Sequence, residues 1–185
     1  MILYRCFAWA ERAGDAGPDG PLWFPRIYQG EGRHDHPDRY GCLYLSLSPL
    51  STVVEQLARF RGQRLLPSLL RRRGLPLALA DLELADSAEL VDLDDPGVLR
   101  HERLRPSRVA TRDRGITQAQ AVELHDRHRH AAGLRWWSTY EALWINVTVF
   151  DRAAAQLRVR SIRALTIEDS IVVEAADVFG LRALP

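Results

Sequence analysis

The sequence predicts an α+β fold with a mixed β-sheet core and flanking helices. Short runs of alternating or β-branched apolar residues recur along the chain, as is typical of strands. Segments with helical spacing lie between some of these runs but not all, so the pattern differs from the regular βαβ alternation of a doubly wound sheet. No convincing linker divides the 185 residues, and this length suits one domain. We therefore expect a single domain over residues 1–185.

Periodicity and turn-forming residues place the expected elements. The expected strands are residues 2–9, 42–47, 75–83, 88–92, 134–138, 143–150 and 157–163. The expected helices are residues 52–62, 117–130 and 167–178, with a turn or short helix starting at Asp95-Pro96-Gly97. Residues 10–22 and 30–41 are rich in glycine, proline and charged residues and are expected to be loops.

The charged residues exclude several kinds of chemistry. The net charge of +1 argues against a dedicated nucleic-acid binder, and the cluster Arg71-Arg72-Arg73, at an expected helix end, is too small to claim one. All 25 Lys-or-Arg positions are arginine, so no lysine can form a Schiff base, anchor pyridoxal phosphate or serve a P-loop. A phosphate group must then be held by arginine, by backbone N–H groups or by a metal ion.

Cysteine and histidine usage indicates a reduced compartment and no metal site. Cys6 and Cys42 are too few for a disulfide framework and are expected to be reduced core thiols of a cytoplasmic protein. No signal peptide is visible, and no stretch approaches the roughly 18 apolar residues of a membrane span. The histidines of residues 125–130 lack His-Glu-x-x-His spacing and a nearby cysteine, so we expect a solvated helix end there.

Arg33, Tyr44 and Glu55 are the first candidates for a functional site. They follow one another at intervals of eleven residues, and the expected elements place them on a loop, a strand and a helix in turn. A cation, an aromatic ring and a carboxylate carried in this way can line one cleft.

Tyr44 lies on the more polar face of its expected strand. Successive side chains of a strand face opposite ways, so Leu43, Leu45 and Leu47 share the expected core face. A tyrosine on the other face can stack on a flat ligand and bond through its hydroxyl. A half-buried structural tyrosine is the alternative.

Two interpretations of Glu55 compete. Thr52-Val53-Val54-Glu55 fits the capping-box pattern, in which the glutamate bonds back to the N–H of the cap residue and does no chemistry. On a helical wheel Glu55 lies about 200° from Val53, away from the apolar stripe. It therefore faces solvent or a cleft, and the eleven-residue spacing favours the cleft.

Two arginines could hold an anion. Arg33 lies in a glycine-rich loop, and its planar guanidinium matches the geometry of phosphate oxygens. A solvated loop arginine is the alternative. Arg5 shares a strand face with Leu3 and Phe7, and a guanidinium on an apolar face must be paired or bind an anion.

Ser138 closes an expected strand after two tryptophans. No Gly-x-Ser-x-Gly elbow surrounds it and no His or Asp partner is evident, so a nucleophilic triad is not expected. An ordinary strand-end serine is the alternative to one that bonds a ligand.

The run from Gly30 to Ser46, continued by Ser48-Pro49 as far as Glu55, resembles the RES-domain family, the toxins of RES–Xre toxin–antitoxin pairs. The resemblance is specific around residues 30–55 and looser from Tyr4-Arg5 to the segment after Ser138. It implies a fold similar to ADP-ribosyltransferases, with a central NAD-binding cleft.

The resemblance also implies roles for individual residues. Glu55, Arg33 and Tyr44 would be catalytic. Tyr4 on the first strand, Arg5 beside it and Ser138 would bind substrate, with Ser138 bonding the ligand or orienting the glutamate. Family members usually place tryptophan or phenylalanine, often followed by asparagine, after the loop arginine, and here His34-Asp35 stands in their place.

The implied activity is degradation of NAD+ by cleavage of the bond between nicotinamide and ribose. Water as acceptor would make the enzyme a glycohydrolase, and inorganic phosphate would make it a phosphorylase; no cofactor is expected. The implied partner is an Xre-type antitoxin, through which alone nucleic acid would be contacted. Three alternatives stay open: ADP-ribosyl transfer to a protein, a non-enzymatic binding module, and a nucleic-acid-acting toxin that uses its arginine surface.

Overall fold

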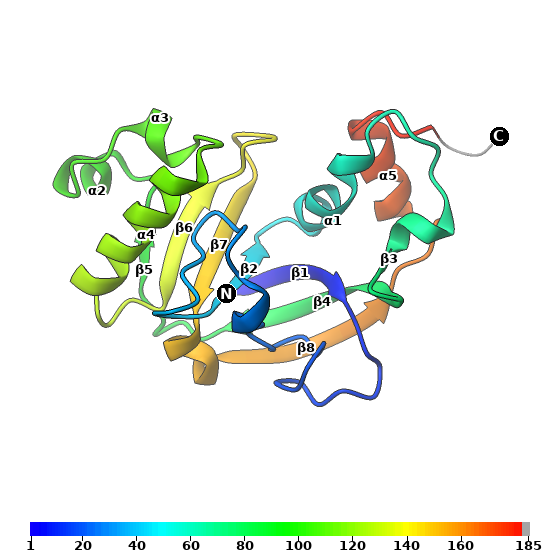
Figure 1. Cartoon of the computed structure of the whole chain (residues 1–185), viewed down its shortest axis with the longest axis horizontal. Coiled ribbons are helices and arrows are strands. Elements are labelled where there is room, and N and C mark those ends of the chain that lie inside the picture. Colours follow the sequence, from blue (N-terminus) through cyan, green and yellow to red (C-terminus); the bar gives the residue numbers. More distant parts are fainter. Residues whose placement is uncertain (183–185) are drawn as a thin grey trace. The chain divides into compact units, whose positions relative to one another are not determined.

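The computed structural model describes residues 1–182 and has the expected α+β fold (Figure 1). The chain forms two compact units. Unit 1 comprises Met1, Phe24–Leu45 and Leu84–Leu157. Unit 2 comprises Ile2–Trp23, Ser46–Glu83 and the residues from Arg158 onward. The single-domain organisation stays a prediction, and each unit is described by itself below.

The strands of unit 1 form a mixed sheet in the order β2-β7-β6-β5. They are β2 (Cys42–Ser46, of which Ser46 belongs to unit 2), β5 (Leu90–Asp92), β6 (Gly133–Trp137) and β7 (Ile145–Phe150). β6 runs parallel to β5 and antiparallel to β7. Apolar and β-branched residues dominate these strands, and the interior of β7 is buried.

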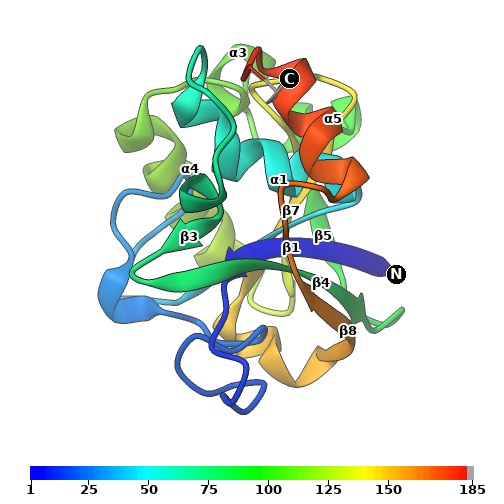
Figure 2. The ribbon, with the colours of Figure 1, turned by 90° about the vertical axis from the view of Figure 1, so that its right-hand side faces the viewer.

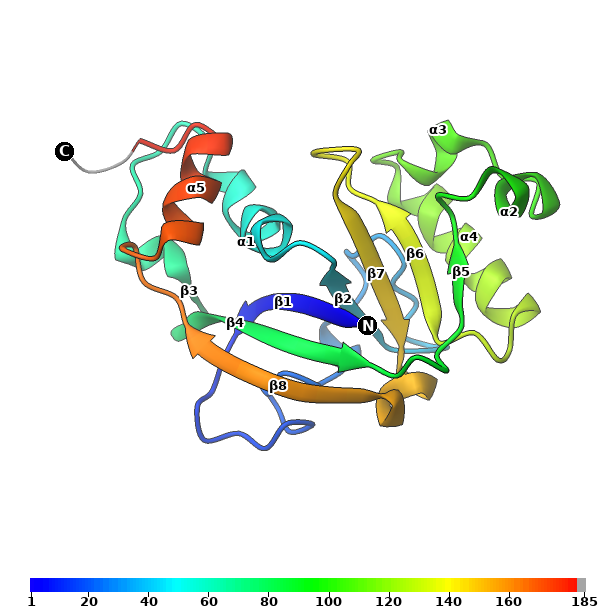
Figure 3. The same ribbon diagram turned by 180° about the vertical axis from the view of Figure 1, so that it is seen from behind.

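Three helices cover this sheet. They are α2 (Pro96–His101), α3 (Pro106–Val109) and α4 (Arg114–Arg127), all seen beside β5 and β6 in Figure 3. Asp95 caps α2 by accepting a hydrogen bond from the N–H of Val98 at 2.8 Å, and Asp113 caps α4 in the same way. Side chains of the helices and of β5 and β6 share one buried apolar cluster that includes Leu99, Leu124 and Trp136. Two 3-10 turns, Arg26–Tyr28 and Asp151–Gln156, complete the unit.

The strands of unit 2 run in the order β3-β4-β1, and β4 also pairs with β8. They are β1 (Ile2–Ala8), β3 (Arg71–Arg72), β4 (Leu75–Leu84) and β8 (Leu157–Ala164). β1 and β4 are antiparallel along their length, from the pair of Ile2 with Glu83 to the pair of Ala8 with Leu77. Ser46, the last residue of β2, pairs with Tyr4 of β1.

Two helices pack together in unit 2, α1 (Pro49–Leu57) and α5 (Ser170–Val178). Figure 2 shows both on the same side of β1 and β4. Their apolar residues recur at helical spacing and are buried: Val53, Val54 and Leu57 in α1, and Val172 and Ala175 in α5. Short 3-10 turns, Ala58–Phe60 and Pro67–Leu70, connect α1 to β3.

The start of α1 corrects the sequence prediction. Ser48 is the N-cap, because its side chain accepts a hydrogen bond from the N–H of Ser51, and Pro49 is the first helical residue. Glu55 is therefore beyond the first turn, and the capping box from Thr52 to Glu55 does not exist. The cap was misplaced because Thr52, like Ser48, is a residue type that commonly caps a helix.

One further prediction about local structure is wrong. Leu47 is not on a core face: its exposed fraction is 38%, because β2 ends one residue earlier. The cluster Arg71-Arg72-Arg73 does follow a helix end, because Arg71 is the C-cap of the 3-10 turn Pro67–Leu70, and its residues then form strand β3 and the turn after it. Arg73 and Gly74 both have positive φ, 48° and 80°, so the chain reverses there into β4.

Other expectations are confirmed. Cys6 and Cys42 are both buried and free. The strands and helices expected beyond residue 75 are present with ends shifted by a few residues, while β3, α3 and the 3-10 turns were not expected. Within residues 1–182 no helix is long and apolar enough to cross a membrane.

Gly133 marks a close approach between two backbones and gives a test of the fold. A Cβ atom at this position would lie 2.0 Å from the carbonyl oxygen of Thr148 and 3.0 Å from the Cα of Val149. Because backbone cannot move aside cheaply, Gly133→Ala should lower the free energy of unfolding by at least about 2 kcal/mol. Urea denaturation followed by circular dichroism measures this. The control is Gly14→Ala, since nothing lies within 4 Å of a Cβ atom at Gly14. An equal loss of unfolding free energy in the two variants would contradict the β6–β7 register.

Candidate active site

The loop 30–41 of unit 1 is organised by the carboxylate of Asp35. Its Oδ2 accepts hydrogen bonds from the N–H groups of Gly30 and Gly32 at 2.8 and 2.7 Å. Its Oδ1 accepts one from the hydroxyl of Tyr44 at 2.6 Å. Asp35 itself is buried. Hydrogen bonds to an ionised carboxylate are the strong kind, so this one side chain fixes the loop to β2.

Gly32 is required by the same arrangement. A Cβ atom at Gly32 would lie 2.5 Å from both the Asp35 carboxylate and the Tyr44 hydroxyl. Only a residue without a side chain allows the loop to close over these two groups. Gly32 is therefore needed for the loop's own packing.

Tyr44 is half-buried and its hydroxyl makes two hydrogen bonds. It donates to Asp35 and accepts from the backbone N–H of His34 at 2.9 Å. Burial, followed by electrostatic interactions with Cys42 and Asp35, holds the pKa of the hydroxyl well above its usual value. Tyr44 is thus protonated at neutral pH, and it can offer a substrate its ring and a fixed dipole but not a base.

Arg33 is buried, with 5% of its surface exposed. Its Nη1 donates hydrogen bonds to the carbonyl oxygens of Val109 and Thr111, both at 2.8 Å. The guanidinium carbon lies 4.7 Å from the ring centroid of Trp136, a cation–π distance. Arg33 therefore joins the loop to the end of α3 and to β6, and it is not the solvated loop arginine considered from the sequence.

His34 occupies the position after the loop arginine as a buried ring. Its Nδ1 lies 2.8 Å from the hydroxyl oxygen of Thr148, which also accepts a hydrogen bond from the indole N–H of Trp136. The rings of His34 and Trp136 meet edge-on at 5.3 Å. Burial, together with the charges of Arg33 and Arg114, holds the pKa of His34 well below its usual value, so the ring is neutral.

Helix α4 supplies two contacts that the sequence analysis missed. The hydroxyl of Thr117 donates to the carbonyl oxygen of Arg33 at 2.6 Å. The side-chain amide of Gln118 donates to the carbonyl oxygens of Gly30 and Gly32, both at 2.9 Å. These residues stand at the start of an expected helix, and nothing in their sequence context distinguished them from ordinary first-turn residues.

Ser138 follows the last residue of β6 and is buried. Its hydroxyl accepts a hydrogen bond from the N–H of Tyr140 at 3.1 Å, and its own N–H donates to the carbonyl oxygen of Trp144 at 2.7 Å. The serine thereby shapes the turn between β6 and β7.

Glu55, Tyr4 and Arg5 belong to unit 2. Glu55 is exposed, on the side of α1 away from the buried residues Val53 and Leu57, as the helical wheel predicts. Tyr4 and Arg5 are half-buried on β1. The structure therefore brings Arg33 and Tyr44 into one hydrogen-bonded cluster in unit 1, and it carries the other three candidates on unit 2.

Arg5 is held by backbone carbonyls rather than by an ion pair. Its guanidinium donates to the carbonyl oxygen of Gly20 at 3.2 Å and to that of Pro21, and it lies 4.6 Å from the ring centroid of Phe7. Burial lowers the pKa of Arg5 to about 9, although electrostatic interactions with Cys6 and with the carboxylate of Asp19 oppose this. The side chain is still cationic at neutral pH.

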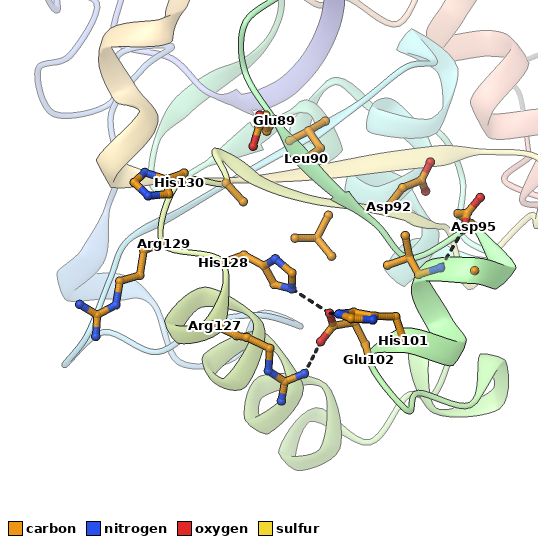
Figure 4. Close-up of a pocket in the computed structure, with 14 residues that line it drawn as sticks. Glu89, Leu90, Asp92, Asp95, His101, Glu102, Arg127, His128, Arg129 and His130 are labelled. Carbon is orange, nitrogen blue, oxygen red and sulfur yellow. Dashed lines mark hydrogen bonds and ion pairs between the residues drawn. The ribbon is translucent and has the colours of Figure 1, made fainter.

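A cavity of about 610 Å³ also opens in unit 1, and none of the residues selected from the sequence lines it. Figure 4 shows Glu102 at its floor, with His128 and Arg127 pointing toward the carboxylate. One oxygen of Glu102 lies 2.9 Å from Nε2 of His128, and the other pairs with Arg127. These contacts tie the end of α2 to the end of α4.

The histidines near residue 128 do lie at a helix end, as expected, but only His130 is exposed to solvent, whereas His125 and His128 are half-buried. His125 stacks on the buried ring of Tyr40 at 4.4 Å and meets Phe150 edge-on, while His128 bonds Glu102. They were misjudged because the polar run His-Asp-Arg-His-Arg-His hides their contacts with distant segments. In the part of the chain that the structure describes, no three His, Cys, Asp or Glu side chains are placed to hold a metal ion.

Comparison with known proteins identifies the family. The model of the RES domain matches residues 2–169. The chain belongs to the RES domain family. Among solved structures, this RES domain is similar to a chain in the crystal structure of the M. tuberculosis MbcT–MbcA toxin–antitoxin complex, with 18% identity and a TM-score of 0.63. The match covers 96% of this chain and 87% of that one, and it establishes likeness of fold. None of the curated proteins matches the sequence.

Asp35 should contribute more to the stability of this RES domain than any neighbouring acidic residue. Asp35→Ala removes the acceptor of three hydrogen bonds, and we expect it to lower the free energy of unfolding by about 2–4 kcal/mol. Asp35→Asn, which keeps one carbonyl oxygen, should have a free energy of unfolding between those of the wild type and of Asp35→Ala. Asp38→Ala is the matched control, because Asp38 is exposed in the same loop. Urea unfolding gives the comparison, and equal losses at the two positions would contradict the proposed anchoring.

Because the buried ring of His34 stays neutral, we expect the stability of the protein to fall as the pH is lowered. The unfolded chain binds a proton at His34 below about pH 6.5 whereas the folded chain does not, so the contribution is complete above that pH and is lost below it. The slope for this residue is up to about 1.4 kcal/mol per pH unit. His34→Phe keeps a buried ring and should reduce the slope of unfolding free energy between about pH 7 and 5. His130→Phe, at an exposed position, is the control; an unchanged slope in His34→Phe would show that the folded protein protonates this ring.

Proposed function

We propose that this RES domain is the toxin of a toxin–antitoxin pair and that it degrades NAD+. The observation that carries the proposal is the match to the RES domain over residues 2–169. It is supported by the similar fold of a chain in a solved toxin–antitoxin complex. A binding module without enzymatic activity is the alternative, and it predicts no loss of NAD+.

The proposed reaction breaks the bond between nicotinamide and C1′ of the adjoining ribose. The bonding electron pair leaves with the pyridinium nitrogen, so nicotinamide departs as a neutral molecule and needs no proton from a general acid. The ribose carbon develops oxocarbenium-like positive charge and is captured by an oxygen of water or of inorganic phosphate. The acceptor's proton is released to solvent. The enzyme therefore needs a carboxylate near the developing charge and cations for the pyrophosphate.

We assign the carboxylate to Glu55. It is exposed on α1, beyond the first turn of the helix. A carboxylate of this kind stabilises the ribosyl cation by electrostatic attraction or through the 2′-hydroxyl of the ribose. Glu55 would act in the transition state rather than in binding.

The other candidates would bind and orient the substrate. Tyr44 offers a ring fixed by its hydroxyl bonds to pack on nicotinamide or its ribose. Arg33 and Arg5 are the proposed ligands of the pyrophosphate, and carbonyl oxygens hold both guanidinium groups in place. Tyr4, which precedes Arg5 on β1, and Ser138 at the end of β6 complete the proposed substrate contacts.

The acceptor defines the finer alternatives. Water would yield ADP-ribose, and inorganic phosphate as co-substrate would yield its phosphorylated form. A protein acceptor would make the chain an ADP-ribosyltransferase. No separate cofactor is needed in any of these, because NAD+ is the substrate.

An NAD+-degrading enzyme needs a protein that restrains it in its own cell. We propose an Xre-type antitoxin, which would exclude substrate by inserting a segment beside the proposed arginines. A carboxylate on that segment would suit guanidinium groups that otherwise hold pyrophosphate.

Glu55→Gln should abolish NAD+ loss while leaving the fold intact. The amide nearly matches the carboxylate in shape but carries no charge to offset the developing cation, so the rate should fall roughly 100- to 1,000-fold. Nicotinamide release from purified protein, followed by chromatography, measures it. Glu174→Gln, the same change at an exposed position of α5, is the matched control and should keep the wild-type rate. Near wild-type activity in Glu55→Gln would refute the catalytic assignment.

A further inference from the structure

The stretch from Gln56 to Ala80 in unit 2 holds six arginines and no acidic residue. The whole chain has a net charge of only +1, so the average hides this local excess. The teal ribbon in Figure 2 follows the stretch from the end of α1 to β3. A dense run of positive charge without intervening acids is the electrostatic footprint of a polyanion site.

The arginines of this stretch are poorly neutralised within the chain. Arg73 pairs with Asp19. In residues 1–182, no carboxylate forms an ion pair with the remaining five, which are Arg59, Arg61, Arg64, Arg71 and Arg72. All of these except the half-buried Arg72 are exposed to solvent.

The structure brings several of these charges close together. The guanidinium carbons of Arg59 and Arg72 lie 5.7 and 5.4 Å from the centroid of the same ring, that of Phe60. Burial and the like charge of Arg59 lower the pKa of Arg72. A bound anion would relieve the repulsion between them, which no carboxylate of the described residues does.

The last described residue extends the same surface. Arg182 forms a parallel β-bridge with Arg64, fixed by hydrogen bonds of 2.9 Å from Leu65 N–H to the Arg182 carbonyl and from Arg182 N–H to the Gln63 carbonyl. Bridge partners extend their side chains to the same face of a ladder. Two exposed guanidinium groups therefore stand next to each other beside the loop that carries Arg61.

We propose that this arginine surface, defined as Arg59, Arg61, Arg64, Arg72 and Arg182, binds the phosphate backbone of nucleic acid without reading its sequence. Several exposed guanidinium groups spread along a loop and two strand segments suit a repeating row of phosphates. A peptide partner would need an apolar anchor in a pocket, and the stretch exposes only Leu66 as a large apolar side chain, while Leu65 and Leu70 are buried. The surface is independent of the proposed reaction with NAD+.

The test measures binding of the full chain to a fluorescent DNA duplex of about 20 base pairs between about 50 and 200 mM salt. Wild type should bind at low salt and weaken steeply as salt rises. The variant Arg59→Gln/Arg61→Gln/Arg64→Gln should reduce the slope of log K against log salt concentration by about two to three, because each lost phosphate contact contributes about 0.9. An RNA duplex of equal length, measured in parallel, should show a similar decrease in slope for the triple variant if only the phosphate backbone is recognised.

Arg100→Gln/Arg105→Gln/Arg108→Gln is the matched control, since it removes the same charge from exposed positions of unit 1. It should bind like wild type. Arg61→Gln/Arg64→Gln leaves the contacts of Arg59 and Arg72 with Phe60 intact, and it replaces the triple variant if that variant does not fold. It should lower the slope of log K against log salt concentration by about two. The proposal is overturned if the control weakens binding equally, if the variants keep wild-type affinity, or if poly-glutamate binds more tightly than either duplex, which would point to an acidic protein.

Discussion

The carboxylate of Asp35 is the group on which the candidate active site of unit 1 depends. It accepts hydrogen bonds from two backbone N–H groups of its own loop and from the hydroxyl of Tyr44 on β2. Through these bonds a glycine-rich segment, which would otherwise have many conformations, is held in one. Arg33 and His34 lie within this closed loop, so their burial follows from the same three bonds. Restricting a loop before substrate arrives reduces the ordering that binding must supply.

An arginine held by carbonyl oxygens occurs in each unit. Arg33 bonds the carbonyls of Val109 and Thr111 and lies over Trp136, and Arg5 bonds the carbonyls of Gly20 and Pro21 and lies over Phe7. Dipoles and aromatic rings satisfy the hydrogen-bonding needs of a guanidinium and hold it in place. This explains how a chain without lysine can present fixed cations.

Much of the architecture could be predicted because it depends on periodicity and local turn chemistry. Alternation placed β1, β4 and β7, and helical spacing placed the buried face of α1. The cap of α1 was misplaced because Ser48-Pro49 and Thr52 both fit a helix start, and only the structure shows that Ser48 accepts the hydrogen bond. β3 was not predicted because a strand of two residues is too short to show the alternation of apolar and polar residues.

Which residues act in the site stays a prediction, and most contacts of those residues could not be predicted from the sequence. The eleven-residue spacing selected Arg33 and Tyr44, which do meet in one cluster. The roles of His34, Thr148 and Gln118 depend on hydrogen bonds that join segments more than 80 residues apart in the sequence, and no local pattern encodes such pairs. The His34-Asp35 pair shows the same limit. As a sequence it was a departure from the expected aromatic and asparagine, whereas in the structure it supplies the buried ring and the anchoring carboxylate of the loop.

The central claim is that this RES domain cleaves NAD+ at the bond between nicotinamide and ribose. The most direct measurement is to incubate the purified protein with NAD+, with and without inorganic phosphate, and to identify the products by mass spectrometry. The account predicts free nicotinamide in equal amount to the NAD+ lost, together with free ADP-ribose or, when phosphate is the acceptor, its phosphorylated form. ADP-ribose found only attached to protein would identify the transferase alternative, and NAD+ that stays intact would contradict the claim.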